Sequence, residues 1–223
     1  MHSTDRNTLL ADSIRLAFGT YNVLNGAWLR SETGKVTGVL GRNGCGKSCL
    51  FRAIMGELKT QEIFVRYNDT VVTGSDEMGR YVKYLAQKPF LPPKMPLKKV
   101  FEYFDADYEE FVNDFPKFAQ YPDTPVKELS GGEVRIAEIW LCLCSGASFC
   151  ILDEPFSYLA PVAVEAIQKL IRRQKHTMGI IVSDHNYEAL LETADEVLFL
   201  SDGYVHLIKD RSDLVRYGYC RAL

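Results

Sequence analysis

Residues 41–48 read Gly-Arg-Asn-Gly-Cys-Gly-Lys-Ser, and this stretch constrains the fold more than any other part of the chain. It fits the pattern G-x-x-x-x-G-K-[ST], in which glycines let backbone N–H groups turn toward phosphate oxygens. A helix that starts near Lys47 adds its positive end, Lys47 adds a charge for the β- and γ-phosphates, and the Ser48 hydroxyl can bind Mg²⁺. The sequence thus predicts a nucleoside triphosphate site formed by Gly41, Arg42, Asn43, Gly44, Cys45, Gly46, Lys47 and Ser48.

A second motif occupies residues 149–154, an apolar strand that ends in Asp153 and Glu154. Parallel strands are buried on both faces, so acids occur where such a strand leaves the sheet at its carboxyl end. Ligands of open α/β sheets bind at that end. Asp153 therefore suits a Mg²⁺ ligand that acts through water, and Glu154 suits the base that orients and deprotonates an attacking water.

The order of the expected elements predicts an α/β fold. Helices at residues 131–144 and 162–174 alternate with strands at residues 149–152 and 179–182, which favours a mostly parallel sheet covered on both faces. Short strands near the N-terminus, beginning with residues 13–18, favour an antiparallel side sheet.

Residues 97–120 are expected to form a small acidic helical subdomain inserted between strands. Residues 101–115 within it contain six acids and no Lys or Arg. An aromatic stripe recurs there at helical spacing, and such a stripe is more often core than binding site. Its members are Phe104, Tyr108, Phe111 and Phe115.

Composition and charge exclude several classes of protein. Hydrophobic residues make up 47% of the chain, but the longest nearly apolar stretch is shorter than the ~20 residues that a membrane span needs, and no signal peptide is expected at the N-terminus. The net charge is 26 − 29 = −3, which predicts no nucleic-acid partner. The six cysteines lack metal-site spacing, so we expect them to be reduced and mostly buried, in a reducing cytoplasm.

A third motif, Leu-Ser-Gly-Gly-Glu at residues 129–133, reads as a capped helix start that could receive an anion. Alone it could be no more than a capped helix. Together with residues 41–48 and 149–154, it makes nearly the whole chain resemble the nucleotide-binding domains of ATP-binding cassette (ABC) transporters. The three stretches look like that family's Walker A loop, LSGG signature and Walker B strand.

The resemblance implies further site residues. Gln87 lies where the family has its Q-loop, which contributes to catalysis and to the metal site, and His185 matches the switch histidine. Phe18 matches the aromatic that stacks on adenine, with Tyr21 as a nearby alternative and plain core packing as another. The metal ligands implied are Ser48, Gln87 and Asp153.

The same resemblance implies an architecture and a cycle. It predicts a P-loop NTPase core with an N-terminal antiparallel β-subdomain, formed by residues 1–88 and 145–223, and a short helical subdomain at residues 89–144. The core would be RecA-like. The expected cofactors are ATP and Mg²⁺. ATP binding would close a head-to-tail dimer, either a homodimer or a pair of cassettes, and hydrolysis would reset it.

The family also implies partners and a location. In the closed dimer, Ser130, Gly131 and Gly132 would act on the other subunit's nucleotide. Separate integral membrane subunits would carry the transport path, and a groove between Gln87 and the helical insert would receive their cytoplasmic helix. The chain would then be cytoplasmic and peripheral, on the inner face of the cell membrane.

Details of the motifs point to a branch and to one departure. Residues 153–156 and 183–186 look most like the lipopolysaccharide-export and branched-chain amino-acid ATPases. Residues 157–160 read Ser-Tyr-Leu-Ala, so Ala160 stands where the family's D-loop has an aspartate that couples the two nucleotide sites. Two rival interpretations are a soluble ABC ATPase of DNA repair or translation and a weakly hydrolysing regulatory cassette, which Ala160 motivates.

Overall fold

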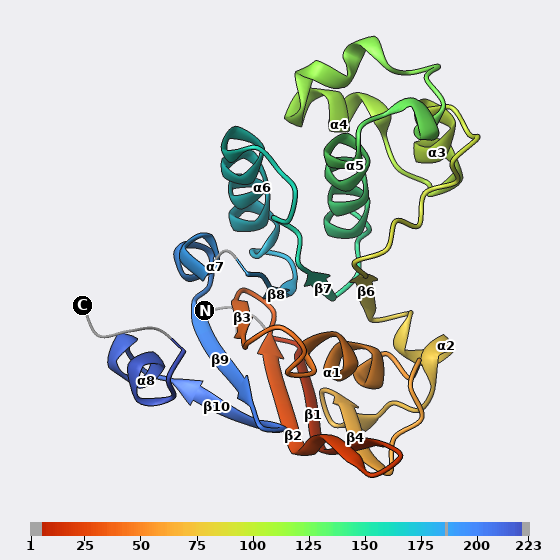
Figure 1. Cartoon of the computed structure of the whole chain (residues 1–223). Coiled ribbons are helices and arrows are strands. Elements are labelled where there is room, and N and C mark those ends of the chain that lie inside the picture. The colour runs from red at the N-terminus through yellow and green to blue at the C-terminus, as the bar shows by residue number, and fades with distance from the viewer. Residues whose placement is uncertain (1–5, 186, 220–223) are drawn as a thin grey trace, which may run out of the picture.

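The computed structural model describes residues 6–185 and 187–219 (Figure 1). The strands of this part of the chain are β1 (Thr8–Phe18), β2 (Tyr21–Glu32), β3 (Val36–Leu40), β4 (Glu62–Tyr67), β5 (Thr70–Val71), β6 (Val82–Leu85), β7 (Phe149–Asp153), β8 (Gly179–Ser183), β9 (Glu196–Ser201) and β10 (Tyr204–Ile208). The α-helices are α1 (Lys47–Ile54), α2 (Ser75–Met78), α3 (Leu97–Tyr103), α4 (Tyr108–Asp114), α5 (Gly131–Leu143), α6 (Pro161–Gln174), α7 (Tyr187–Thr193) and α8 (Arg211–Arg216). Two short 3₁₀ helices, η1 (Pro116–Gln120) and η2 (Val126–Glu128), precede α5.

The larger sheet has the strand order β10-β9-β3-β8-β7-β6. Its neighbouring strands pair in parallel from β9 to β6, and β10 adds to the edge as an antiparallel strand. Every residue of β3, β7 and β8 is buried, as expected for central strands covered on both faces. The mostly parallel sheet predicted from the sequence is confirmed.

The smaller sheet is antiparallel and has the order β2-β1-β4-β5, which confirms the predicted β-subdomain. Its first strand is longer than expected, because it begins at Thr8 rather than at Ser13. Ser13 has a φ of +55°, and the register of β1 against β2 shifts between Ala11 and Ile14. The β-bulge at Ser13 interrupts the alternation of apolar and polar residues along β1. The sequence pattern therefore predicts only the second half of the strand.

The helical insert differs from the expected subdomain in one respect. α3 ends at Tyr103, Asp105 adopts a φ of +54°, and the Asp107 carboxylate caps α4 by accepting from the Glu109 N–H at 2.7 Å. The aromatic stripe therefore does not lie on one helix. Tyr108, Phe111 and Phe115 are buried, but Phe104, on the other side of the break, is 40% exposed, so the prediction was wrong for that residue.

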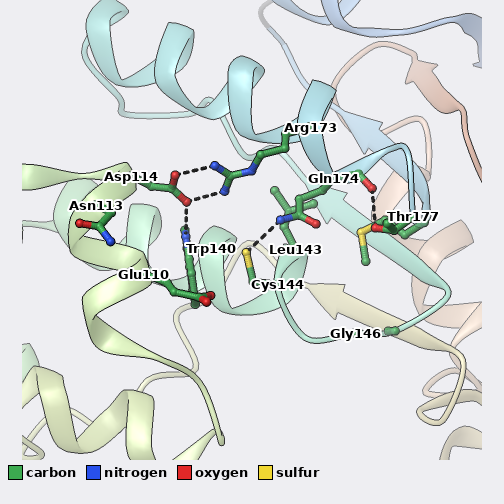
Figure 2. Close-up of a pocket in the computed structure, with 12 residues that line it drawn as sticks. Glu110, Asn113, Asp114, Trp140, Leu143, Cys144, Gly146, Arg173, Gln174 and Thr177 are labelled. Carbon is green, nitrogen blue, oxygen red and sulfur yellow. Dashed lines mark hydrogen bonds and ion pairs between the residues drawn. The ribbon is translucent and has the colours of Figure 1, made fainter.

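Figure 1 shows the helical insert (α3, α4, α5) and the β-subdomain at opposite ends of the molecule. On the outer side of the insert, the Asp114 carboxylate accepts two hydrogen bonds from the Arg173 guanidinium of α6 and one from the Trp140 indole N–H at 2.8 Å (Figure 2). We call Asp114, Trp140 and Arg173 the outer junction. The insert boundaries at residues 89 and 144 stay predictions.

Other expectations have mixed outcomes. Cys142 and Cys150 are buried, whereas Cys45, Cys49 and Cys144 are partly exposed, so the described cysteines are less buried than expected. The remaining cysteine, at position 220, and residue 186 of the branch pattern lie outside the described residues. No helix among the described residues is both long enough and apolar enough to span a membrane.

Candidate functional site

The loop at residues 41–48 leaves the buried strand β3 and enters α1. Gly46, the residue before α1, has a φ of +109°, and a Cβ there would lie 2.9 Å from a Val23 methyl group. A Cβ on Gly41 would lie 2.7 Å from the carbonyl oxygen of Leu200. These glycines are therefore required by the path of the backbone, which curls the loop around the N-terminus of α1, where the first N–H groups have no intrahelical partner.

The ammonium group of Lys47 lies within this loop. Lys47 is 5% exposed, and its Nζ donates to the carbonyl oxygen of Gly41 at 2.7 Å and more weakly to that of Arg42 at 3.4 Å. A positive charge held inside the loop, next to the positive end of α1, makes the loop a site for an anion.

The three predicted metal ligands, Ser48, Gln87 and Asp153, are each held by hydrogen bonds. Gln87 follows β6 and its Nε2 donates to the Ser48 hydroxyl at 3.1 Å. Asp153, at the end of β7, is fully buried, and its two carboxylate oxygens accept from Ser183 Oγ at 2.8 Å and from Tyr84 OH at 3.3 Å. Asp153 is thus held rigidly, with both oxygens already bonded.

Glu154 and His185 form a close pair at the carboxyl ends of β7 and β8. His185 Nε2 lies 2.7 Å from Glu154 Oε1. Glu154 adopts a φ of +54°, and its N–H donates to the carbonyl oxygen of Ser183 at 2.8 Å. A non-glycine residue in this left-handed region is uncommon, and such residues gather at functional sites.

These segments meet in one open cleft of about 500 Å³, which we call the nucleotide cleft. Two exposed aromatic rings, Phe18 and Tyr21, lie at its mouth, so both alternatives for the predicted adenine contact remain open. The residues that line it are Phe18, Tyr21, Val23, Asn43, Gly44, Gly46, Lys47, Ser48, Cys49, Gln87, Glu154 and His185.

Some predicted site residues do not line this cleft. The Arg42 guanidinium donates to the carbonyl oxygen of Gly218 at 2.5 Å, so its side chain is held by the C-terminal segment. Ser130, Gly131 and Gly132 lie at the start of α5, outside the lining of the cleft. Their helix start is closed by a capping box with Glu133. Burial alone would raise the pKa of Glu133, but Lys117 and Ser130 lower it to about 2.

The sequence predicted no site role for Tyr84, Ser183 or Arg135, although Ser183 belongs to the pattern at residues 183–186. Tyr84 and Ser183 hold Asp153 through hydroxyl groups, and Arg135 of α5 donates to the backbone carbonyl of Asp153 at 2.5 Å. For Tyr84 and Ser183, the only sequence signal of such a role is weak: each is a hydroxyl residue near the end of a predicted strand. Arg135 gives none, because its partners are backbone atoms of distant segments.

Comparison with known proteins gives a family match. The family model described as ABC transporter matches residues 24–157, which is more than half of the chain. An uncharacterized ABC transporter ATP-binding protein of Rhizobium meliloti is 30% identical, over 93% of this chain and 82% of its own length. The lipopolysaccharide export system ATP-binding protein LptB of Acidithiobacillus ferridurans is also 30% identical, over 88% of each chain.

Among solved structures, the ATP-binding subunit of an ABC transporter superposes with a TM-score of 0.80. It is 21% identical, and the match covers 96% of this chain and 95% of the other. The match shows the same fold over 96% of this chain. The predicted likeness to the lipopolysaccharide-export branch is confirmed by the similarity to LptB.

Proposed function

This chain belongs to the ABC transporter family, in which it is an ATP-binding subunit with ATPase activity, and on that premise we propose how its residues bind and hydrolyse ATP. One observation carries the proposal. Four segments that are far apart in the sequence bring Lys47, Gln87 and the Glu154–His185 pair into one cleft. That arrangement supplies a phosphate site and a base together.

The phosphates of ATP would occupy the loop at residues 41–48. The loop fits them because its glycines leave a cradle that a Cβ would obstruct, and because Lys47 and the N-terminus of α1 supply positive charge. Phe18 or Tyr21 would cover the adenine at the mouth of the cleft. Arg42 would contribute through its backbone, since its side chain is bonded to Gly218.

The donor set around Ser48 also fits Mg²⁺, which prefers oxygen ligands and keeps several of its waters. Ser48 and Gln87 would bind directly, and Asp153 would act through water because Ser183 and Tyr84 already bond its oxygens. The ion would neutralise charge on the phosphates.

Glu154 would accept a proton from the attacking water. The water oxygen forms the new bond to the γ-phosphorus, the bond from that phosphorus to the bridging oxygen breaks, and ADP and phosphate leave. His185, at 2.7 Å from Glu154 Oε1, would orient the carboxylate. Its role is positioning, through the carboxylate it contacts.

A second cassette would complete the site. Ser130, Gly131 and Gly132 lie outside the cleft of their own chain, which suits a head-to-tail dimer in which they meet the nucleotide of the partner cassette. Ala160 precedes α6 and is exposed, so it is available for such an interface. The dimer would contain two copies of this chain or this chain and a related cassette.

Membrane subunits would dock beside Phe90. A groove of about 330 Å³ lies between the loop after Gln87 and the helical insert, and its rim includes Phe90 and Phe104, each 40% exposed. Their rings meet edge to face at 5.5 Å. A groove that combines these aromatic rings with polar side chains such as Lys83 and Asp105 fits an amphipathic helix, here a cytoplasmic helix of the transporter. The chain would then lie on the inner face of the cell membrane.

Steady-state hydrolysis of ATP by the whole chain, with Mg²⁺ present, tests this proposal. We expect slow but measurable turnover, and Lys47→Ala should weaken ATP binding in calorimetry and abolish turnover. Unchanged ATP affinity in that variant would contradict the placement of the phosphates. Co-purification with membrane subunits would separate this function from that of a soluble ABC ATPase.

A further inference from the structure

Helix α5 carries a buried ion pair between the signature glycines and the core sheet. The Arg135 Nη1 atom lies 3.6 Å from Glu138 Oε2, and the two side chains are 11% and 0% exposed. Burying two charges is unfavourable unless hydrogen bonds satisfy them, so the partners of the pair show what it holds.

The partners of Arg135 are three backbone carbonyl groups. Its Nη1 donates to Ala86 at 2.6 Å, and its Nη2 donates to Asp153 at 2.5 Å and to Glu154 at 3.4 Å. Ala86 immediately precedes Gln87 in the chain. One guanidinium group therefore fixes the backbone that carries both acids of the site and the backbone next to Gln87.

The partners of Glu138 belong to the loop that follows Gln87. Its Oε1 accepts from the N–H groups of Phe90 at 2.6 Å and Leu91 at 3.3 Å, while Oε2 has the Arg135 ion pair and no hydrogen bond. Leu91 packs into the apolar core under the insert, and Phe90 forms part of the rim of the docking groove. The Arg135–Glu138 pair thus connects the docking groove at Phe90 to the proposed base, Glu154, through a single turn of α5.

We propose that Arg135 and Glu138 are positioning residues that hold Glu154 and Gln87 where hydrolysis requires them. They do so by fixing both segments relative to α5 and to the loop that carries Phe90. Arg135 also contacts the carbonyl oxygen of Glu154 at 3.4 Å, next to the left-handed backbone of that residue. Because the pair sits on the helix that begins with the signature glycines, a shift of α5 toward a second cassette moves both catalytic segments with it. This inference rests on the proposed function, since it assigns a supporting role to the same site.

The test separates positioning from plain stabilisation. Arg135→Lys keeps the charge but loses the fork that spans three carbonyl groups. We expect kcat to fall about 10- to 100-fold, because a displacement of about 1 Å at a reacting group has effects of that size. ATP affinity, measured by calorimetry, should stay within about twofold, because Arg135 does not line the nucleotide cleft.

Glu138→Gln is the second variant, and it keeps the size of the side chain. Its amide oxygen can still accept from Phe90 and Leu91, but the ion pair is lost. We expect a smaller fall in kcat with unchanged ATP affinity, and a loss in the double variant that is smaller than the product of the two single losses. Arg173→Lys is the matched control, because it removes a similar fork from the outer junction, and its kcat should stay within about twofold.

The outcomes are distinguishable. The inference is overturned if Arg135→Lys and Glu138→Gln both keep wild-type kcat, or if each loss of kcat is matched by the lost folded fraction in a thermal melt. It is also overturned if Arg173→Lys lowers kcat as much as Arg135→Lys does. A wild-type chain that neither binds nor hydrolyses ATP would instead refute the proposed function, whatever the variants do.

Discussion

Two of the polar junctions between the helical insert and the core are built differently. The inner junction, Arg135 and Glu138, is buried and bonds to backbone groups beside the nucleotide cleft. The outer junction joins side chain to side chain, and the Arg173 side chain there is 56% exposed (Figure 2). In our proposal, the inner junction positions the catalytic segments, whereas the outer one stabilises the attachment of the insert.

The magnitudes of the two kinds of contact support this division. An exposed ion pair typically contributes about 0–1 kcal/mol, although the two-pronged geometry at Asp114 is at the favourable end. Removing one partner of a buried pair typically costs about 3–5 kcal/mol, because the other charge is left without compensation. Removing a charge at the inner junction should thus lower stability by more than removing one at the outer junction, so kcat at the inner junction has to be compared at equal folded fraction.

The largest effect is expected at Glu154, whose backbone the inner junction holds. Glu154→Gln removes the proposed proton acceptor but keeps the size of the side chain, so hydrolysis should fall by about 10²–10⁴-fold while ATP still binds. The variant should accumulate as an ATP-bound dimer, which light scattering with ATP and Mg²⁺ would detect. If Glu154→Gln hydrolyses ATP at the wild-type rate, Glu154 is not the base. The inner junction would then have no base to position.

The next prediction concerns the outward side of the same junction. Phe90 bonds to Glu138 through its backbone, so Phe90→Asp should leave that bond in place while adding a charge to the rim of the docking groove. We expect basal ATPase to stay nearly intact and assembly with the membrane subunits to be lost, as measured by co-purification. Phe90→Leu is the matched control and should assemble. A lowered melting temperature in Phe90→Asp would show instead that the ring packs on its own insert.

A smaller effect is expected at the outer junction. Asp114→Asn removes the charge that faces Arg173 and should lower the free energy of unfolding by roughly 1 kcal/mol, or about 2–4 °C in melting temperature. Turnover should stay within about twofold. A large fall in kcat would show that the two junctions are not distinct in function.

The pH dependence of this variant gives a second check. Hydrogen bonds from Arg173, and to a lesser extent from Trp140, lower the pKa of Asp114 below its ordinary value of 3.8. The charged form is therefore favoured in the folded state, and its contribution is complete above that ordinary pKa and is lost as pH falls through the lowered one. The difference in melting temperature between the wild type and Asp114→Asn should shrink as the pH is lowered from 5 to 3.

The two junctions also show what a sequence can and cannot predict. The phosphate loop, the Asp153–Glu154 strand end and the fold class were predictable, because each rests on neighbouring residues or on the alternation of strands with helices. Arg135 was not, because apart from its ion pair with Glu138 its partners are backbone carbonyl groups 18 to 49 positions away. The break at Asp105 was missed because aromatic spacing continues across it while the backbone changes direction.

Short or irregular segments were missed for a related reason. α2 has four residues and α8 has six, too few to show a helical period. Tyr84 and Ser183 are ordinary strand residues in the sequence, and their contact with Asp153 depends on the lateral order of β6, β7 and β8. Such order comes from the tertiary fold and has no local signal.

The smallest effect is expected at Ala160, which belongs to neither junction and faces outward before α6. A methyl group there lacks the acceptor that the family's aspartate offers across the dimer, and a neutral hydrogen bond contributes about 0.5–1.5 kcal/mol net. That range changes turnover several-fold without preventing the dimer, so we expect a slow, weakly cooperative ATPase that is largely monomeric until ATP binds. Ala160→Asp should raise the rate or the Hill coefficient, measured as rate against ATP concentration at equal protein concentration. If both values stay unchanged, this position does not limit the coupling between the two nucleotide sites. A lower rate would mean that the surrounding apolar residues, Tyr158 and Val162, favour an apolar contact here.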